Sequence, residues 1–283
     1  MSIKRIKNDK VFAGNVEVYR HSSEVNHCDM QFSVFRPKQE QHSSVPLLTW
    51  LSGLTCTEDT FMFKAGALKM ASDLGIMILA PDTSPRGDNV PDDENGAYDF
   101  GLGAGLYVNA TKSPWQTHYN MYDYVTKELP SIITSNFNVD KNRFGIFGHS
   151  MGGHGALTIA LKNPGIFKSV SAFSPICNPS KIPWGKKAFT KYLGNDESSW
   201  HDYDACSLVS SQGWHSEILV DQGSDDEFVA EQLKPETLIS ACKEKEVELS
   251  LRMHAGFDHS YFFISSFIEK HLHFHAGILG KGA

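Results

Sequence analysis

The sequence predicts an α/β protein built on a mostly parallel, twisted β-sheet, with helices on both faces and antiparallel strands at its N-terminal edge. Two observations predict this class. From residue 45 onward, short apolar runs alternate with helical segments, a pattern typical of parallel strands joined by crossover helices. Before residue 37, two stretches alternate apolar with polar residues, as half-buried strands do.

The expected strands follow from these runs in chain order. The two alternating stretches, 16–19 and 30–35, predict the antiparallel edge. The apolar runs predict parallel strands at 45–51, 76–80, 144–147, 170–173, 218–220 and 247–251.

Helices are expected between the strands, where apolar residues recur at helical spacing. They are predicted at 58–72, 119–135, 152–162, 234–245 and 261–279. The third ends at Asn163-Pro164-Gly165, a strong stop signal. Residues 82–114 show little periodicity, and a loop of this length usually serves a functional site. No repeat or boundary divides the chain, which predicts a single domain over residues 1–283.

Composition narrows the class of protein. The 283 residues are 41% hydrophobic and 21% charged, enough for an ordinary core, which excludes wholesale disorder. The chain has a net charge of −7, without the excess of Lys and Arg that is typical of a nucleic-acid-binding protein. The five cysteines contain no C-x-x-C pair and predict reduced thiols. The N-terminus has no apolar leader and no apolar run nears ~18 residues, so we expect a cytoplasmic protein without membrane association.

The strongest chemical signal is the G-x-S-x-G sequence of residues 148–152. It lies directly between a predicted strand and a predicted helix, the setting in which such a turn exposes a nucleophilic serine. Small residues at Gly148, Gly152 and Gly153 leave room for the strained serine between them. We therefore predict Ser150 as a nucleophile.

A serine nucleophile needs a histidine base and a carboxylate, which on such a sheet follow in the order serine, acid, histidine. His259 lies in a glycine-containing loop after the last predicted strand and is the expected base. His254 is the rival, but it stands close to the strand end. His149 and His154 flank Ser150 too closely to reach back to it and are expected to shape the turn.

Spacing alone does not identify the acid, because several carboxylates lie in the loop after the strand 218–220. The candidates are Asp221, Asp225, Asp226 and Glu227. The pattern favours Asp226, with Asp225 as runner-up. Asp258 is adjacent to the base and is expected to be structural.

The tetrahedral intermediate needs two amide donors, one from the residue after the nucleophile and one from the loop after the third strand. Met151 supplies the first. The second loop is 52–57, where Gly53 permits a close approach and the Leu54 amide is the expected donor.

Metal and nucleotide sites are not predicted. His271 and His275 have a spacing that could bind a metal, but no third ligand is apparent. The glycines of 101–105 lack the spacing and the following lysine of a phosphate loop. We therefore expect no cofactor.

Taken together, these motifs resemble one family over nearly the whole chain, the S-formylglutathione hydrolases, also called esterase D. The segments that carry the resemblance are 50–57, 81–87, 103–111, 114–115, 148–155, 183–189 and 257–262. The resemblance implies the α/β-hydrolase fold and hydrolysis of S-formylglutathione to formate and glutathione, a step in formaldehyde detoxification. It also implies a homodimer. At matching positions it implies Ser150, Asp226 and His259 as the triad, with Leu54 and Met151 as oxyanion donors.

Substrate contacts are expected around the same loops. Because a formyl group is small, Trp184 or Trp115 is expected to narrow the acyl side of the pocket. Glutathione carries two carboxylates, so local cations are needed, and Lys186, Lys187 and Arg86 are the candidates. Cys56 is expected as a thiol near the site.

Other functions remain open on the sequence. The same triad could serve a general short-chain carboxylesterase or an acyltransferase. A noncatalytic binding protein of this fold would normally lack a triad member, and none is missing here.

Overall fold

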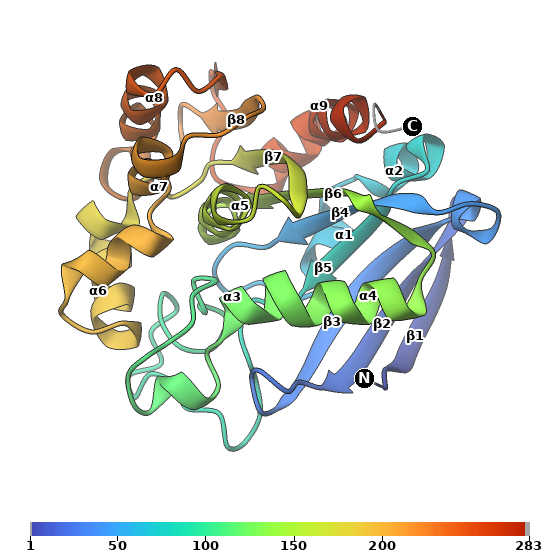
Figure 1. The fold of residues 1–283 in the computed structure, drawn as a ribbon, viewed down its shortest axis with the longest axis horizontal. Helices are drawn as coiled ribbons and strands as arrows, with labels where there is room; N and C mark the ends of the chain where they lie inside the picture. Colours follow the sequence, from blue (N-terminus) through green and yellow to red (C-terminus); the bar gives the residue numbers. More distant parts are fainter. Residues whose placement is uncertain (1, 281–283) are drawn as a thin grey trace.

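A twisted nine-stranded sheet runs through the computed structural model, which describes residues 2–280. Its strands are β1 (Lys4–Val11), β2 (Gly14–Ser22), β3 (Asp29–Pro37), β4 (Val45–Leu51), β5 (Met77–Pro81), β6 (Val139–His149), β7 (Phe167–Phe173), β8 (Ile218–Gly223) and β9 (Leu249–His254). They lie in the order β1-β2-β3-β5-β4-β6-β7-β8-β9 (Figure 1). The pairs β1·β2, β2·β3 and β3·β5 are antiparallel. The remaining pairs, β5·β4, β4·β6, β6·β7, β7·β8 and β8·β9, are parallel. The predicted fold class is confirmed.

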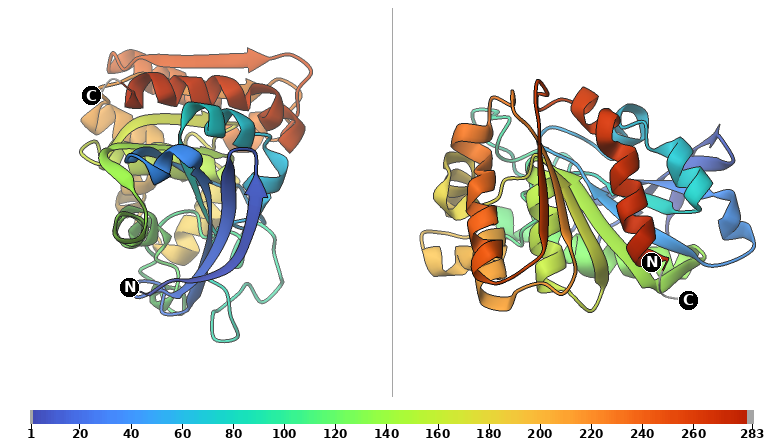
Figure 2. Two further views of the ribbon diagram at one scale, coloured as in Figure 1. Left: turned by 90° about the vertical axis from the view of Figure 1, so that its right-hand side faces the viewer. Right: turned by 90° about the horizontal axis from the view of Figure 1, so that it is seen from above.

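Helices cover both faces of this sheet. They are α1 (Thr60–Lys64), α2 (Leu68–Leu74), α3 (Met121–Asp123), α4 (Leu129–Asn136), α5 (Met151–Lys162), α6 (Pro183–Tyr192), α7 (Ala205–Gln212), α8 (Pro235–Glu244) and α9 (Tyr261–Leu279). One face carries α9 with α1 and α2, and the other carries α5 and α4 (Figures 1 and 2). Within residues 2–280, no helix combines the length and the apolar character needed to cross a bilayer.

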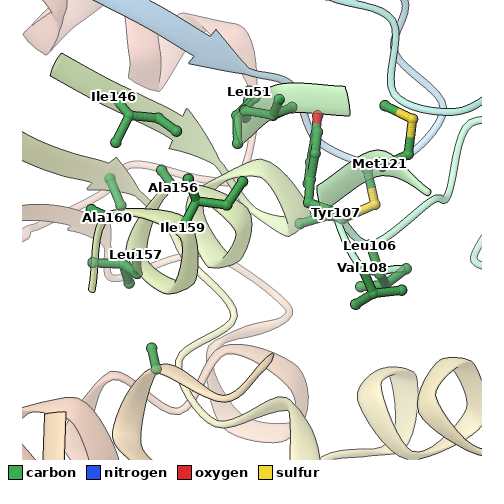
Figure 3. Packing of buried hydrophobic residues seen from close by; sticks show 14 of the residues in the cluster. Leu51, Leu106, Tyr107, Val108, Met121, Ile146, Ala156, Leu157, Ile159 and Ala160 are labelled. Carbon is green, nitrogen blue, oxygen red and sulfur yellow. The ribbon is translucent and has the colours of Figure 1, made fainter. Parts of the chain in front are cut away.

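The central strands are buried on both faces, which explains why they read as continuous apolar runs. In β4, Leu48 and Trp50 face the α9 side, whereas Leu47 and Leu51 face the α5 side. Trp50 packs against Phe147, with ring centroids 4.7 Å apart. On the other face, Figure 3 shows residues of α5 beside Ile146 of β6 and Leu51 of β4.

Several elements differ from the sequence-based expectation. The helix expected at 58–72 is two helices, because Gly66 adopts a φ of +70° between α1 and α2. Strand β1 was not expected, since it is an almost fully exposed edge strand with no apolar alternation. Helices α6 and α7 were not expected either. The last strand extends to His254, which belongs to β9 itself.

The long segment 82–114 contains no helix and only isolated bridges, as expected, but it is tied down by specific hydrogen bonds. The Gly103 amide donates to Ser84 Oγ at 2.8 Å, and the Leu102 amide donates to Asp92 Oδ1 at 2.9 Å. The segment therefore holds a fixed path over the carboxyl end of the sheet, where it reaches the candidate site.

A buried polar network lies between α9 and the sheet. His275 Nδ1 and Nε2 lie 2.7 Å from Ser169 Oγ and 2.8 Å from Ser171 Oγ, and His271 Nδ1 lies 2.8 Å from Ser171 Oγ. His271 Nε2 lies 3.2 Å from Asp221 Oδ2, whose carboxylate also accepts two bonds from Arg252. The two histidines considered as metal ligands are thus tied to serines.

Buried histidines make stability depend on pH. Burial lowers the pKa of His271 and His275, and lowers that of His154 to about 4. As the pH falls through 6.5, the unfolded chain binds protons at these histidines before the folded chain does, so stability is lost. His154 alone should cost at most about 1.4 kcal/mol per pH unit between pH 6.5 and its folded pKa of about 4. We expect the free energy of unfolding, measured in urea, to fall steeply from pH 6.5 toward pH 4.5.

The His154→Gln variant should show a shallower pH slope than the unsubstituted chain. His273→Gln is the matched control, because His273 is exposed on the same helix that carries His271. An identical slope in all three proteins would contradict the assignment.

Candidate active site

Ser150 stands at the sharp turn between β6 and α5. Its backbone has φ 56° and ψ −118°, a conformation rare for non-glycine residues that costs about 1–3 kcal/mol. Gly152 makes the turn possible, because a Cβ there would overlap the Leu51 carbonyl. The turn places Ser150 at the carboxyl end of the parallel strands, in the wall of a cavity.

His259 and Asp226 form a hydrogen-bonded pair at the same end of the sheet. His259 Nδ1 lies 2.5 Å from Asp226 Oδ2, and the two residues follow β9 and β8. With Nδ1 bound to the carboxylate, Nε2 is the ring nitrogen that is left to exchange a proton with Ser150. No hydrogen bond joins Ser150 Oγ to His259 in the described chain, and bonds of this kind often tighten only when substrate binds.

The Asp226 carboxylate is buried and held by three donors. Besides His259, Gln222 Nε2 donates to Oδ2 at 3.0 Å and the Phe228 amide donates to Oδ1 at 2.9 Å. Burial alone would raise the pKa of Asp226, but these hydrogen bonds outweigh it and the pKa is lowered. Asp226 is therefore ionised at neutral pH.

The other carboxylates of this region have different partners. Asp225 is exposed and accepts from Ser224 Oγ at 2.7 Å, so the geometry pairs His259 with Asp226 and not with the runner-up. Asp258 is exposed and accepts from Ser260 Oγ at 2.6 Å. Asp221 is buried in the network with Arg252 and His271.

The other histidines near the sequence motifs occupy separate positions. His254 Nε2 lies 3.1 Å from Asp221 Oδ1, and its ring lies against Phe267, with centroids 3.8 Å apart. His154 is buried behind the turn, with Nε2 3.1 Å from the Leu106 carbonyl. His149 is different: it lines the cavity, and its ring centroid is 4.4 Å from that of His259. Burial lowers the pKa of His149 well below its usual value, so it is neutral.

A cavity of about 260 Å³ contains Ser150 and His259 in its wall. Its lining is mostly apolar and aromatic, with few polar groups. The lining residues are Gly53, Leu54, Thr55, Cys56, Tyr98, His149, Ser150, Trp184, Phe228, His259, Ser260 and Tyr261. A small aromatic cavity of this kind suits a small uncharged reacting group.

The loop after β4 lies directly against the serine. A Cβ at Gly53 would be 3.3 Å from Ser150 Cβ and 3.2 Å from His149 Nδ1, so only a glycine allows this approach without displacing its neighbours. In residues 2–280, neither the Leu54 amide nor the Met151 amide donates to another group. Both amides are available for an oxyanion beside Ser150.

The substrate contacts expected from the sequence divide into two groups. Cys56 and Trp184 line the cavity. Trp115 does not, because it packs against Phe100 and Tyr119 in an aromatic cluster. Arg86 is also outside the cavity lining, bound to Asp82 at 2.7 Å, and Lys186 is exposed away from the cavity.

Three aromatic cavity residues were not expected from the sequence. Phe228 and Tyr261 each stand two residues after a triad position, a proximity that could have indicated them. Tyr98 comes from the long segment 82–114, which was expected to serve a site without any particular residue being singled out.

Known proteins match this chain along its whole length. Residues 22–274 match the esterase family model described as "Putative esterase". The S-formylglutathione hydrolases of Rattus norvegicus and Mus musculus are 53% and 52% identical to it over 99% of both chains. The chain belongs to the S-formylglutathione hydrolase family. The solved structure of an S-formylglutathione hydrolase from Agrobacterium tumefaciens is 48% identical, with a TM-score of 0.95 over 97% of this chain and 99% of that chain.

Membership in the S-formylglutathione hydrolases confirms the resemblance and the α/β-hydrolase fold expected from the sequence. It also establishes the chain as a hydrolase of the esterase type. The particular residues of the site rest on the geometry described above.

Proposed function

We propose that this chain hydrolyses S-formylglutathione to glutathione and formate, with Ser150 as nucleophile, His259 as general base and acid, and Asp226 as the orienting carboxylate. The observation that carries the proposal is that strained Ser150 and His259, whose ring is bound to Asp226, lie in the wall of one small cavity. Full-length identity above 50% to rat and mouse S-formylglutathione hydrolases supports the substrate.

The first half of the reaction forms a formyl ester on the serine. Ser150 Oγ attacks the formyl carbon while His259 Nε2 takes the hydroxyl proton, and Asp226 stabilises the resulting imidazolium. The carbonyl oxygen becomes negative and accepts hydrogen bonds from the Leu54 and Met151 amides. The intermediate then breaks its carbon–sulfur bond, and the departing thiolate receives the proton from His259.

The second half returns the enzyme to its starting state. Water gives a proton to His259 Nε2 and attacks the formyl carbon of the ester. The second tetrahedral intermediate breaks its bond to Ser150 Oγ, which takes the proton back from His259. Formate leaves, and the overall change is the hydrolysis of one thioester bond.

The proposal also covers the compartment, the domain and the oligomeric state of the enzyme. All five cysteines are free thiols, which supports a reducing compartment such as the cytoplasm. We place the activity in one domain that spans residues 1–283, and we propose a homodimer from the family resemblance.

The acyl side of the cavity should select the formyl group. Trp184 is buried between Tyr98 and Phe228, with its ring centroid 4.8 Å from that of Phe228, and these rings leave little room for a longer chain. We expect kcat/KM to fall at least about tenfold for each added carbon, measured on formyl, acetyl and butyryl thioesters of glutathione. Trp184→Ala should reduce the ratio of kcat/KM for the formyl substrate to kcat/KM for the butyryl substrate.

A side-by-side assay separates this proposal from the alternatives. A general short-chain carboxylesterase would process a short aryl acetate as well as S-formylglutathione, and an acyltransferase would pass the acyl group to an added alcohol in preference to water. Trp214→Ala is the matched control, because Trp214 lies outside the cavity. Equal rates on formyl and butyryl thioesters would contradict the proposal.

A further inference from the structure

A second hollow adjoins the catalytic cavity. It has a volume of about 620 Å³ and is lined by Lys64, Ser260, Tyr261, Phe262 and Ser265. Ser260 and Tyr261 also line the catalytic cavity, so the two spaces meet at the side chains that directly follow His259.

The walls of the hollow combine one cation with exposed aromatic surface. Phe262, in the wall of the hollow, is 83% exposed at the start of α9, and Phe63, next to Lys64 on α1 but outside the lining, is 69% exposed. The Lys64 ammonium lies 5.8 Å from the centroid of the Tyr261 ring. Within residues 2–280, this ammonium forms no ion pair, whereas the nearby Asp258 carboxylate already accepts from Ser260.

The other cations that were considered as substrate contacts either form ion pairs or lie outside both the cavity and the hollow. The Arg86 guanidinium is bound by Asp82, and Lys187 is bound by Asp99 at 2.5 Å. Lys186 is exposed but lines neither the cavity nor the hollow. Because the chain has a net charge of −7, an anionic substrate must be attracted by a local cation, and Lys64 is placed for this role.

We propose that this hollow holds the glutathione part of S-formylglutathione, with the Lys64 ammonium paired to one of its carboxylates and Phe262 covering its apolar stem. The inference rests on the proposed function. A tripeptide extends to about 10 Å, so glutathione attached to a formyl group at Ser150 must leave the small catalytic cavity. The hollow shares Ser260 and Tyr261 with that cavity, and the charge of Lys64 in its wall complements the carboxylates of the tripeptide.

The test compares a charged and a neutral substrate. We expect Lys64→Met to raise the KM for S-formylglutathione about two- to fivefold, the range for an exposed ion pair, and Lys64→Glu to raise it about tenfold. The kcat of both variants should stay close to that of the unsubstituted chain. Lys64→Arg should retain the original KM, and KM for a neutral aryl acetate should not change in any variant. Added salt should raise the KM of the unsubstituted chain more than that of Lys64→Met.

Lys186→Met is the matched control, since it removes an exposed lysine outside both spaces, and its KM should be unchanged. An unchanged KM in Lys64→Met and Lys64→Glu overturns the inference alone, provided that the unsubstituted chain hydrolyses S-formylglutathione. An equal rise in KM for the neutral ester, or for Lys186→Met, also overturns it. Absence of S-formylglutathione hydrolysis by the unsubstituted chain overturns the proposed function and the inference together.

Discussion

Ser150→Gly is expected to abolish hydrolysis of S-formylglutathione and, at the same time, to stabilise the fold. Removal of the nucleophile should lower kcat by about 10⁴- to 10⁶-fold, leaving only the contribution of the oxyanion donors and substrate binding. The backbone at this position has φ 56° and ψ −118°, which glycine adopts with less strain than serine. The free energy of unfolding should therefore rise by about 1 kcal/mol or more.

Two measurements check this expectation. Hydrolysis is followed by release of glutathione, and unfolding is followed in urea at pH 7.5. Ser150→Ala is the matched comparison, because alanine also lacks the hydroxyl but keeps the Cβ that makes the backbone strained. Both variants should lose activity and labelling by a fluorophosphonate, and only the glycine variant should gain stability. Retained hydrolysis in either variant would refute the role of Ser150.

The serine turn could be predicted from sequence because its requirements are local. The turn between β6 and α5 needs small residues within two positions of Ser150, and all of them are adjacent in the chain. The strand ends that carry the base and the acid could be placed for the same reason, since apolar runs and the loops after them are read from neighbouring residues.

The acid could not be chosen from spacing alone. Asp225 and Asp226 are neighbours, and what separates them is a contact with His259, which lies 33 residues beyond Asp226. The geometry of the loop after β8 exposes Asp225 and buries Asp226. Such a difference depends on tertiary packing, which no local pattern encodes. The pattern favours Asp226 over Asp225, and the family resemblance agrees with that choice.

The pocket walls were the least predictable part of the site. Trp115 and Trp184 are equally large and lie in motifs that resemble the family, yet Trp184 lines the cavity while Trp115 packs with Tyr192 and Phe100. These partners are distant in sequence, so nothing near Trp115 indicates its surroundings. Strand β1 was missed for a different reason: an exposed edge strand has no buried face to leave an apolar pattern.

Asp226→Asn is expected to lower kcat by about 10⁴-fold while leaving the fold and the KM nearly intact. The reason lies in the donors that surround this carboxylate. The Phe228 amide is fixed in the backbone and donates to Oδ1, so an asparagine must keep its carbonyl oxygen there. Its NH₂ group then takes the place of Oδ2, facing His259 Nδ1 and Gln222 Nε2.

The buried amide of Gln222 can flip to pair with the asparagine. The His259 imidazole can pair with it only by changing its tautomer, and it then no longer acts as a base. Gln222 Oε1 has no hydrogen-bond partner in the described chain, so a flip of the amide presents this oxygen to the new NH₂ group. The flip gives up the bond that Nε2 donates to the Gly223 carbonyl at 3.1 Å. His259 must then accept at Nδ1 and carry its proton on Nε2, where it can no longer take the proton of Ser150. The substituted site is therefore well packed and inactive.

A double substitution tests this argument. Gln222→Leu removes the partner that can flip, so the pair Asp226→Asn and Gln222→Leu should be less stable than the sum of the single changes predicts, with coupling of about 0.5–3 kcal/mol. Stability is measured in urea, and the tautomer of His259 is read from its ring ¹⁵N chemical shifts. A proton that remains on Nδ1 in Asp226→Asn, or activity within tenfold of the unsubstituted chain, would show that Asp226 does not set the state of the base.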